Sequence, residues 1–158
     1  MPCEFTSPTF GRLDWDETLG KMIKFMADDP MASYEVIIGT DSQAQNGSAD
    51  YVSALIVHKR GNGGVYFWSR QKLNNIHSLK QRIWQEALIS LQLAEKLVGD
   101  FKTFGLTELD MEIHVDVGPN GPTRDMIAEI VGMIRANGFK VATKPSSWGA
   151  SHVADRHV

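Results

Sequence analysis

The stretch YEVIIGTDSQ, residues 34–43, reads as a short apolar strand followed at once by an acid. We expect this strand to run from Tyr34 to Gly39 and to carry Asp41 to the point where it ends. In α/β proteins ligands bind in the crevice beyond the carboxyl ends of the strands, so a carboxylate at this position suits a functional site. The alternative is a turn former or helix cap, which is the commoner role of an Asp after a strand.

The composition is that of one globular domain. The chain has 158 residues, of which 42% are hydrophobic and 22% charged, enough to bury a single core. Cys3 is the single cysteine, so no disulfide can form within the chain and a cytoplasmic protein is expected. We expect no membrane partner, because no apolar run reaches the length of a signal peptide or a membrane span.

Charge is distributed unevenly along the chain. The formal net charge is -3, yet residues 51–85 contain no Asp or Glu and hold six cations, namely Lys59, Arg60, Arg70, Lys72, Lys80 and Arg82. Such a stretch favours contact with phosphates. A solvated hairpin surface is the equally weighted alternative.

Residues 1–33 are predicted to form an irregular arm followed by a helix that packs on the core. Residues 34–158 are predicted to form the main domain. The helix begins at Asp14, which has Glu17 in capping-box spacing, and ends near Pro30. After residues 34–39 comes a polar turn, and then residues 51–60 and 64–73 read as two further strands of an antiparallel meander. Trp68 in this meander either packs or stacks on a base.

A long helix is predicted over residues 78–100, with Ser78 as its cap and Gly99 near its end. Glu86 falls on the flank of the apolar face of this helix. Burying an unpartnered carboxylate costs several kcal/mol, so Glu86 is expected beside a cation, a metal or a cleft, unless it reaches around to solvent.

Two more acids occur in the last third of the chain. Residues 109–118 alternate strictly as a strand that ends near Asp116. A helix over residues 123–138 with Thr123 as its cap and a last strand at residues 139–145 follow. The tail places Asp155 between two histidines, His152 and His157.

The acids occur in the order Asp, Glu, Asp, Asp along alternating strands and helices, and this pattern resembles the ribonuclease H-like fold. More closely, the chain looks like the ribonuclease H-like family of the YkuK type, on the motifs IGTDSQ, QEALISLQLAEKL, HVDVGPNGPTRDMIAEIVGMIRANGFKV and SHVADRH. The resemblance implies an α/β, three-layer fold with a mixed five-stranded sheet, three antiparallel strands plus two parallel, flanked by helices.

Four acids in one place need a positive partner, because clustered carboxylates repel one another. All-oxygen ligation favours Mg²⁺ or Mn²⁺, with two ions when substrate is bound. The hypothesis is therefore metal-dependent hydrolysis of a nucleic-acid phosphodiester. Asp41 bridges the two ions, Glu86 and Asp116 hold one ion, and Asp155 completes the other. His152 assists proton transfer, or is a surface histidine.

Substrate contacts are expected from Ser42, Gln43, Lys72, Asn120, Thr123, Arg124, Lys144 and Trp148. The substrate is RNA, DNA or a hybrid. Two alternatives stay open: a non-catalytic module that binds nucleic acid or protein, and another phosphoryl-transfer activity at the same acids.

Overall fold

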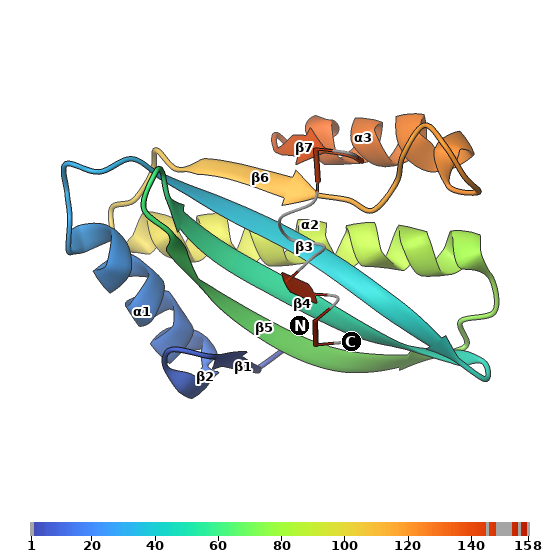
Figure 1. Ribbon diagram of the computed structural model, residues 1–158, viewed down its shortest axis with the longest axis horizontal. Helices are drawn as coiled ribbons and strands as arrows, with labels where there is room; N and C mark the ends of the chain where they lie inside the picture. The colour runs from blue at the N-terminus through green and yellow to red at the C-terminus, as the bar shows by residue number, and fades with distance from the viewer. Residues whose placement is uncertain (1, 145, 148–152, 155, 158) are drawn as a thin grey trace.

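A seven-stranded mixed sheet forms the centre of the molecule (Figure 1). The computed structural model describes residues 2–144, 146–147, 153–154 and 156–157. The strand order is β2-β1-β5-β4-β3-β6-β7. The strands are β1 (Glu4–Ser7), β2 (Gly11–Asp14), β3 (Tyr34–Gln45), β4 (Ser48–Lys59), β5 (Gly64–Asn74), β6 (Asp110–His114) and β7 (Lys140–Ala142).

The α/β class and the three-plus-two strand arrangement are confirmed. β3, β4 and β5 form the antiparallel meander, and β6 and β7 run parallel to β3. The count of five strands was too low, because β1 and β2 extend the sheet beyond β5.

β1 and β2 occupy the segment that was expected to be an irregular arm. They pair along their length, with Phe5 opposite Leu13, and Thr6 pairs with Trp68 of β5. Phe5 is only 1% exposed and belongs to the main core. Four-residue strands are too short to show an alternating pattern, and their stability comes from pairing with a distant strand.

β3 is longer than the strand predicted over residues 34–39. It pairs with β4 as far as Gln45 and Ser48, and the two residues between them, Asn46 and Gly47, have φ angles of 39° and 82°. Positive φ at both central residues is the geometry of a tight two-residue hairpin. The polar residues after Gly39 therefore continue the strand, and Asp41 lies within β3.

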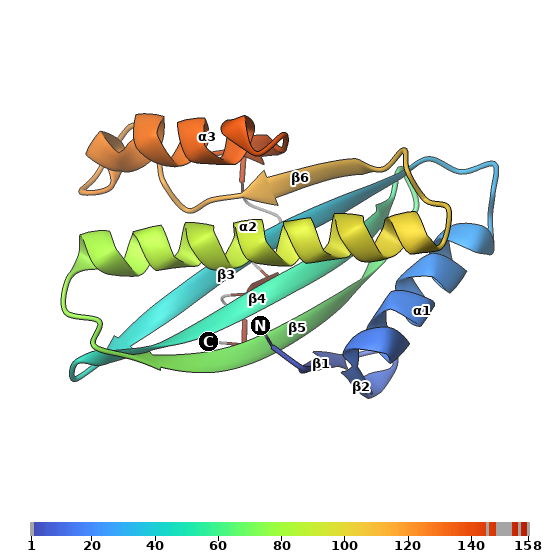
Figure 2. The same ribbon diagram turned by 180° about the vertical axis from the view of Figure 1, so that it is seen from behind.

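Three α-helices pack on one face of the sheet, and α2 crosses β3 and β4 in the view of Figure 2. They are α1 (Trp15–Ala27), α2 (Leu79–Thr103) and α3 (Ile127–Ala136), the last preceded by a 3-10 turn at Arg124–Met126. Both expected caps of the first two helices are present, at Asp14 and Ser78. α2 continues past Gly99, because Phe101 is fully buried and extends the apolar face.

The described C-terminal residues Val153, Ala154 and His157 lie on the opposite face of the sheet. Val153 and Ala154 pack against β4 and Trp68. The ring of His157 stacks on Trp68 with centroids 4.3 Å apart, so Trp68 packs within the molecule. Among the described residues no helix combines the length and apolar character needed to cross a bilayer.

Candidate functional site

Three of the four predicted acids line one cavity beside the end of β6. Asp41 from β3, Glu86 from α2 and Asp116, two residues after β6, border a space of about 530 Å³. β6 ends at His114, opposite Gly39, whereas β3 runs on. Asp41 therefore lies beyond the end of the neighbouring strand, and this offset places it at the cavity.

Glu86 is the most buried acid of the cavity, with 5% of the residue exposed. The Ser42 hydroxyl donates a hydrogen bond to Glu86 Oε1 at 2.5 Å. Burial is the largest cause that raises the pKa of Glu86 to about 8; the Ser42 hydrogen bond lowers it, and the charges of Asp41 and Asp116 raise it. Near neutral pH the metal-free cavity therefore keeps a proton on this acid.

Two cations line the same cavity. Lys144 Nζ lies 2.7 Å from Asp116 Oδ1, and Arg82 donates through Nη1 to the backbone carbonyl of Ser42 at 3.0 Å. Arg82 was noticed in the sequence only as part of a basic stretch. Its position one helical turn before Glu86 is the signal that could have placed it here, because residues four apart share a helix face.

A buried hydroxyl network fixes the elements that carry the acids. Thr40 Oγ1 lies 3.0 Å from Ser53 Oγ and 2.8 Å from Ser90 Oγ. These contacts join β3, β4 and α2 at the residue before Asp41 and one helical turn after Glu86. The backbones that present the two acids are thereby held in one register.

Four of the predicted substrate contacts line the cavity, namely Ser42, Asn120, Thr123 and Lys144. Thr123 does not cap the helix as expected, because its side chain makes no cap hydrogen bond. Its hydroxyl accepts no hydrogen bond from the backbone amides of the first helical turn. Thr123 lines the cavity instead.

The other predicted contacts lie elsewhere or are not described. Gln43 and Lys72 are exposed, each opposite Asp50 in the sheet, and neither is a described lining residue of the cavity. Arg124 is exposed, and its Nε lies 3.5 Å from Asp125 Oδ1 in an ion pair. Trp148, His152 and Asp155 fall outside the described residues.

The donor chemistry of the cavity fits a hard divalent cation, because three carboxyl groups and two hydroxyls supply only oxygen ligands. As they stand, however, the described His, Cys, Asp and Glu side chains form no group of three that could hold a metal. Asp116 is engaged by Lys144 and Glu86 by Ser42. Binding an ion therefore requires these contacts to rearrange.

The chain belongs to the ribonuclease H-like family: the model of the family described as Ribonuclease H-like matches residues 17–158. Within this family it is similar to the Uncharacterized protein YkuK of Bacillus subtilis (strain 168), with 29% identity over 157 residues that cover 92% of this chain and 91% of that protein. The resemblance seen in the motifs is thereby confirmed.

Solved structures give a weaker likeness. RNase H1 from the halophilic archaeon Halobacterium salinarum NRC-1 aligns with a TM-score of 0.40 and 13% identity, over 78% of this chain and 99% of that chain. The N-terminal RNase H domain of a Mycobacterium tuberculosis protein aligns with a TM-score of 0.37 and 13% identity, over 78% of this chain and 93% of that chain.

Proposed function

We propose that the protein hydrolyses phosphodiester bonds of nucleic acid with the help of divalent metal ions. The convergence of Asp41, Glu86 and Asp116 on one cavity, in a chain of the ribonuclease H-like family, carries this proposal. The all-oxygen donor set favours Mg²⁺ or Mn²⁺.

In this proposal Asp41 would serve both of two divalent ions, Glu86 and Asp116 would hold one of them, and Asp155 would complete the other. Such ions would supply polarisation of the phosphodiester, activation of a water and stabilisation of the leaving oxygen. The chain itself supplies the carboxylates, and Glu86 among them is almost fully buried.

Substrate contacts are proposed from the polar residues that share the cavity. Lys144 and Ser42 lie next to the acids, and Asn120 and Thr123 border the same space. Groups of this kind bind the sugar-phosphate backbone and position it without reading its sequence. We propose RNA, DNA or a hybrid as the substrate, with His152 assisting proton transfer.

The test is cleavage of labelled RNA, DNA and hybrid oligonucleotides in Mn²⁺ or Mg²⁺. We expect Asp41→Asn to abolish cleavage, because it removes the proposed bridging carboxylate. Asp125→Asn is the matched control, since it removes the same charge from a side chain that is 89% exposed. Equal cleavage by Asp41→Asn and the wild type would point to a contaminant or to another site.

A second candidate function is a binding module without turnover. The ion pair between Lys144 and Asp116 favours it, because an ammonium already compensates one of the acids. A ribonuclease H-like scaffold can bind nucleic acid without cutting it. Binding of the oligonucleotides with no cleavage in any divalent metal would support this candidate over the nuclease.

A further inference from the structure

Lys144 directly contacts a carboxylate of the cavity. Its Nζ lies 2.7 Å from Asp116 Oδ1, and its side chain is 56% exposed while that of Asp116 is 31% exposed. Lys144 borders the same space as Asp41 and Glu86. The ammonium therefore reaches in from the solvent side and lies against Asp116.

The backbone around Lys144 is built to hold it there. The Lys144 amide donates to the Val117 carbonyl at 2.8 Å, which ties the exit of β7 to the segment after β6. A Cβ added at Gly118 would meet the Cβ of Lys144 at 2.9 Å, closer than real side chains approach. The lack of a side chain at position 118 is what leaves room for the stem of Lys144.

The position of this ammonium has a consequence for metal binding. An ammonium and a divalent ion compete for the same carboxylate oxygens of Asp116. Even without direct competition, a single charge about 5 Å from a divalent ion repels it in a water-like medium by enough to change a binding constant about tenfold. The second cation, Arg82, donates a hydrogen bond to the backbone carbonyl of Ser42, and its charge lowers the pKa of Glu86.

We propose that Lys144 is a built-in counter-ion of the acidic cavity, which a divalent ion must displace from Asp116 in order to bind. The lysine stabilises the metal-free carboxylates and, for the same reason, weakens the affinity of the site for metal. This inference rests on the proposed metal-dependent function and deepens it by naming a residue that sets metal affinity.

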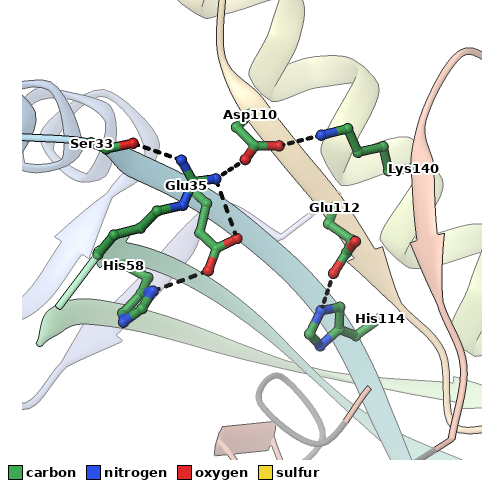
Figure 3. A network of polar contacts seen from close by, with 8 residues as sticks. Ser33, Glu35, His58, Asp110, Glu112, His114 and Lys140 are labelled. Atoms are coloured by element: carbon green, nitrogen blue, oxygen red, sulfur yellow. Dashed lines mark hydrogen bonds and ion pairs between the residues drawn. The ribbon is translucent and has the colours of Figure 1, made fainter. Parts of the chain in front are cut away.

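The experiment compares Mn²⁺ binding by calorimetry in the wild type, Lys144→Met and a matched control, Lys140→Met. Lys140 Nζ lies 2.6 Å from Asp110 Oδ1, in a network that also contains Glu35 and Arg60 (Figure 3). The control thus removes the same charge and the same kind of ion pair, but from an acid that does not line the cavity.

We expect Lys144→Met to bind Mn²⁺ about tenfold more tightly than the wild type, with the difference shrinking as salt is added. We expect Lys140→Met to match the wild type within about twofold.

Each result bears on the inference. Equal or weaker Mn²⁺ binding by Lys144→Met, with measurable binding by the wild type, overturns the counter-ion role and leaves the proposed function standing. Equal gains in Lys144→Met and Lys140→Met also overturn it, because the effect would then be one of general charge. If no variant binds Mn²⁺, both the proposed function and this inference are wrong.

Discussion

Glu86 differs from the other acids of the cavity because it is held in the protein interior. Its residue exposure is 5%, whereas 31% of the Asp116 side chain is exposed. Burial raises the pKa of Glu86 to about 8, so the folded protein holds a proton that the unfolded chain releases at much lower pH. Binding of a cation at this carboxylate would expel that proton.

The first prediction follows from this proton. Because the folded pKa of Glu86 lies above its ordinary value of 4.5, the folded state binds more protons between those values, and stability falls as pH rises from about 4.5 to about 8. We expect Glu86→Gln, which keeps an oxygen for the Ser42 hydroxyl, to remove this loss and to be about 2–4 kcal/mol more stable than the wild type at about pH 9.

The measurement is urea unfolding of both proteins in EDTA at about pH 5 and about pH 9. Near pH 5 the two proteins should differ little, because Glu86 is then protonated in the folded state. If stability changes with pH by the same amount in both proteins, the carboxyl of Glu86 is not the group that titrates. Glu129→Gln, at an exposed position of α3, is the control for loss of a negative charge.

At the scale of the element, α2 carries Glu86 and is fixed by its apolar face. Leu93, two turns after Glu86, is fully buried, whereas Leu88 on the same helix is 36% exposed. We predict that Leu93→Ala costs about 3 kcal/mol through lost burial and the cavity left behind. Leu88→Ala should cost less than about 1 kcal/mol. Similar losses in urea unfolding would mean that α2 does not pack as described.

The N-terminal hairpin gives a second prediction at this scale. Phe5 of β1 is 1% exposed and lies 5.6 Å, between ring centroids, from Trp15. We predict that Phe5→Ala lowers the free energy of unfolding by about 3–5 kcal/mol. Phe104→Ala, at a site that is 61% exposed, is the same substitution and should cost less than about 1 kcal/mol. A small loss in the free energy of unfolding of Phe5→Ala would mean that β1 contributes little to the core.

The elements that could be predicted are those with a local signal. Asp14 and Ser78 cap their helices as expected, because capping depends on residues three positions away. β1 and the distal half of β3 were missed, because each is stabilised by a partner strand and not by its own pattern. Here pairing across the sheet decides the structure over local propensity.

In the cavity, too, the residues with a local sequence signal could be predicted and the long-range contact could not. Glu86 could be found from its place on the flank of an apolar helix face. Asp116 could be found from the alternation predicted over residues 109–118, although β6 itself ends at His114. The contact between Lys144 and Asp116 could not be predicted, since it depends on how closely the exit of β7 packs against Gly118. The spacing of residues along the chain does not determine how closely these two segments pack.

At the scale of the whole molecule, the acids meet only because a parallel strand ends early. β6 stops opposite Gly39, while β3 and β4 continue as a hairpin. α2 crosses this hairpin in the view of Figure 2. Leu19 and Met22 of α1, within the predicted N-terminal part of residues 1–33, belong to the same core as β3, β4 and α2. Folding of the whole chain is therefore what assembles the cavity.

The last prediction uses this dependence of the site on folding. An unfolded chain separates Asp41, Glu86 and Asp116, so Mn²⁺ should bind the folded state and stabilise it. At a free Mn²⁺ concentration about one hundred times the dissociation constant, the gain is about 2.7 kcal/mol. For a chain of this length, that corresponds to a rise in Tm of about 5–10 °C, which EDTA should reverse.

Asp41→Asn should lose most of this rise in Tm, whereas Leu88→Ala should keep it, because Leu88 is 36% exposed and supplies no ligand. The comparison separates specific binding from general screening of charge by Mn²⁺. Screening would stabilise both variants alike, and the same rise would then appear with a monovalent salt at equal ionic strength. A rise that depends on Asp41 and requires a divalent ion can come only from the assembled acids.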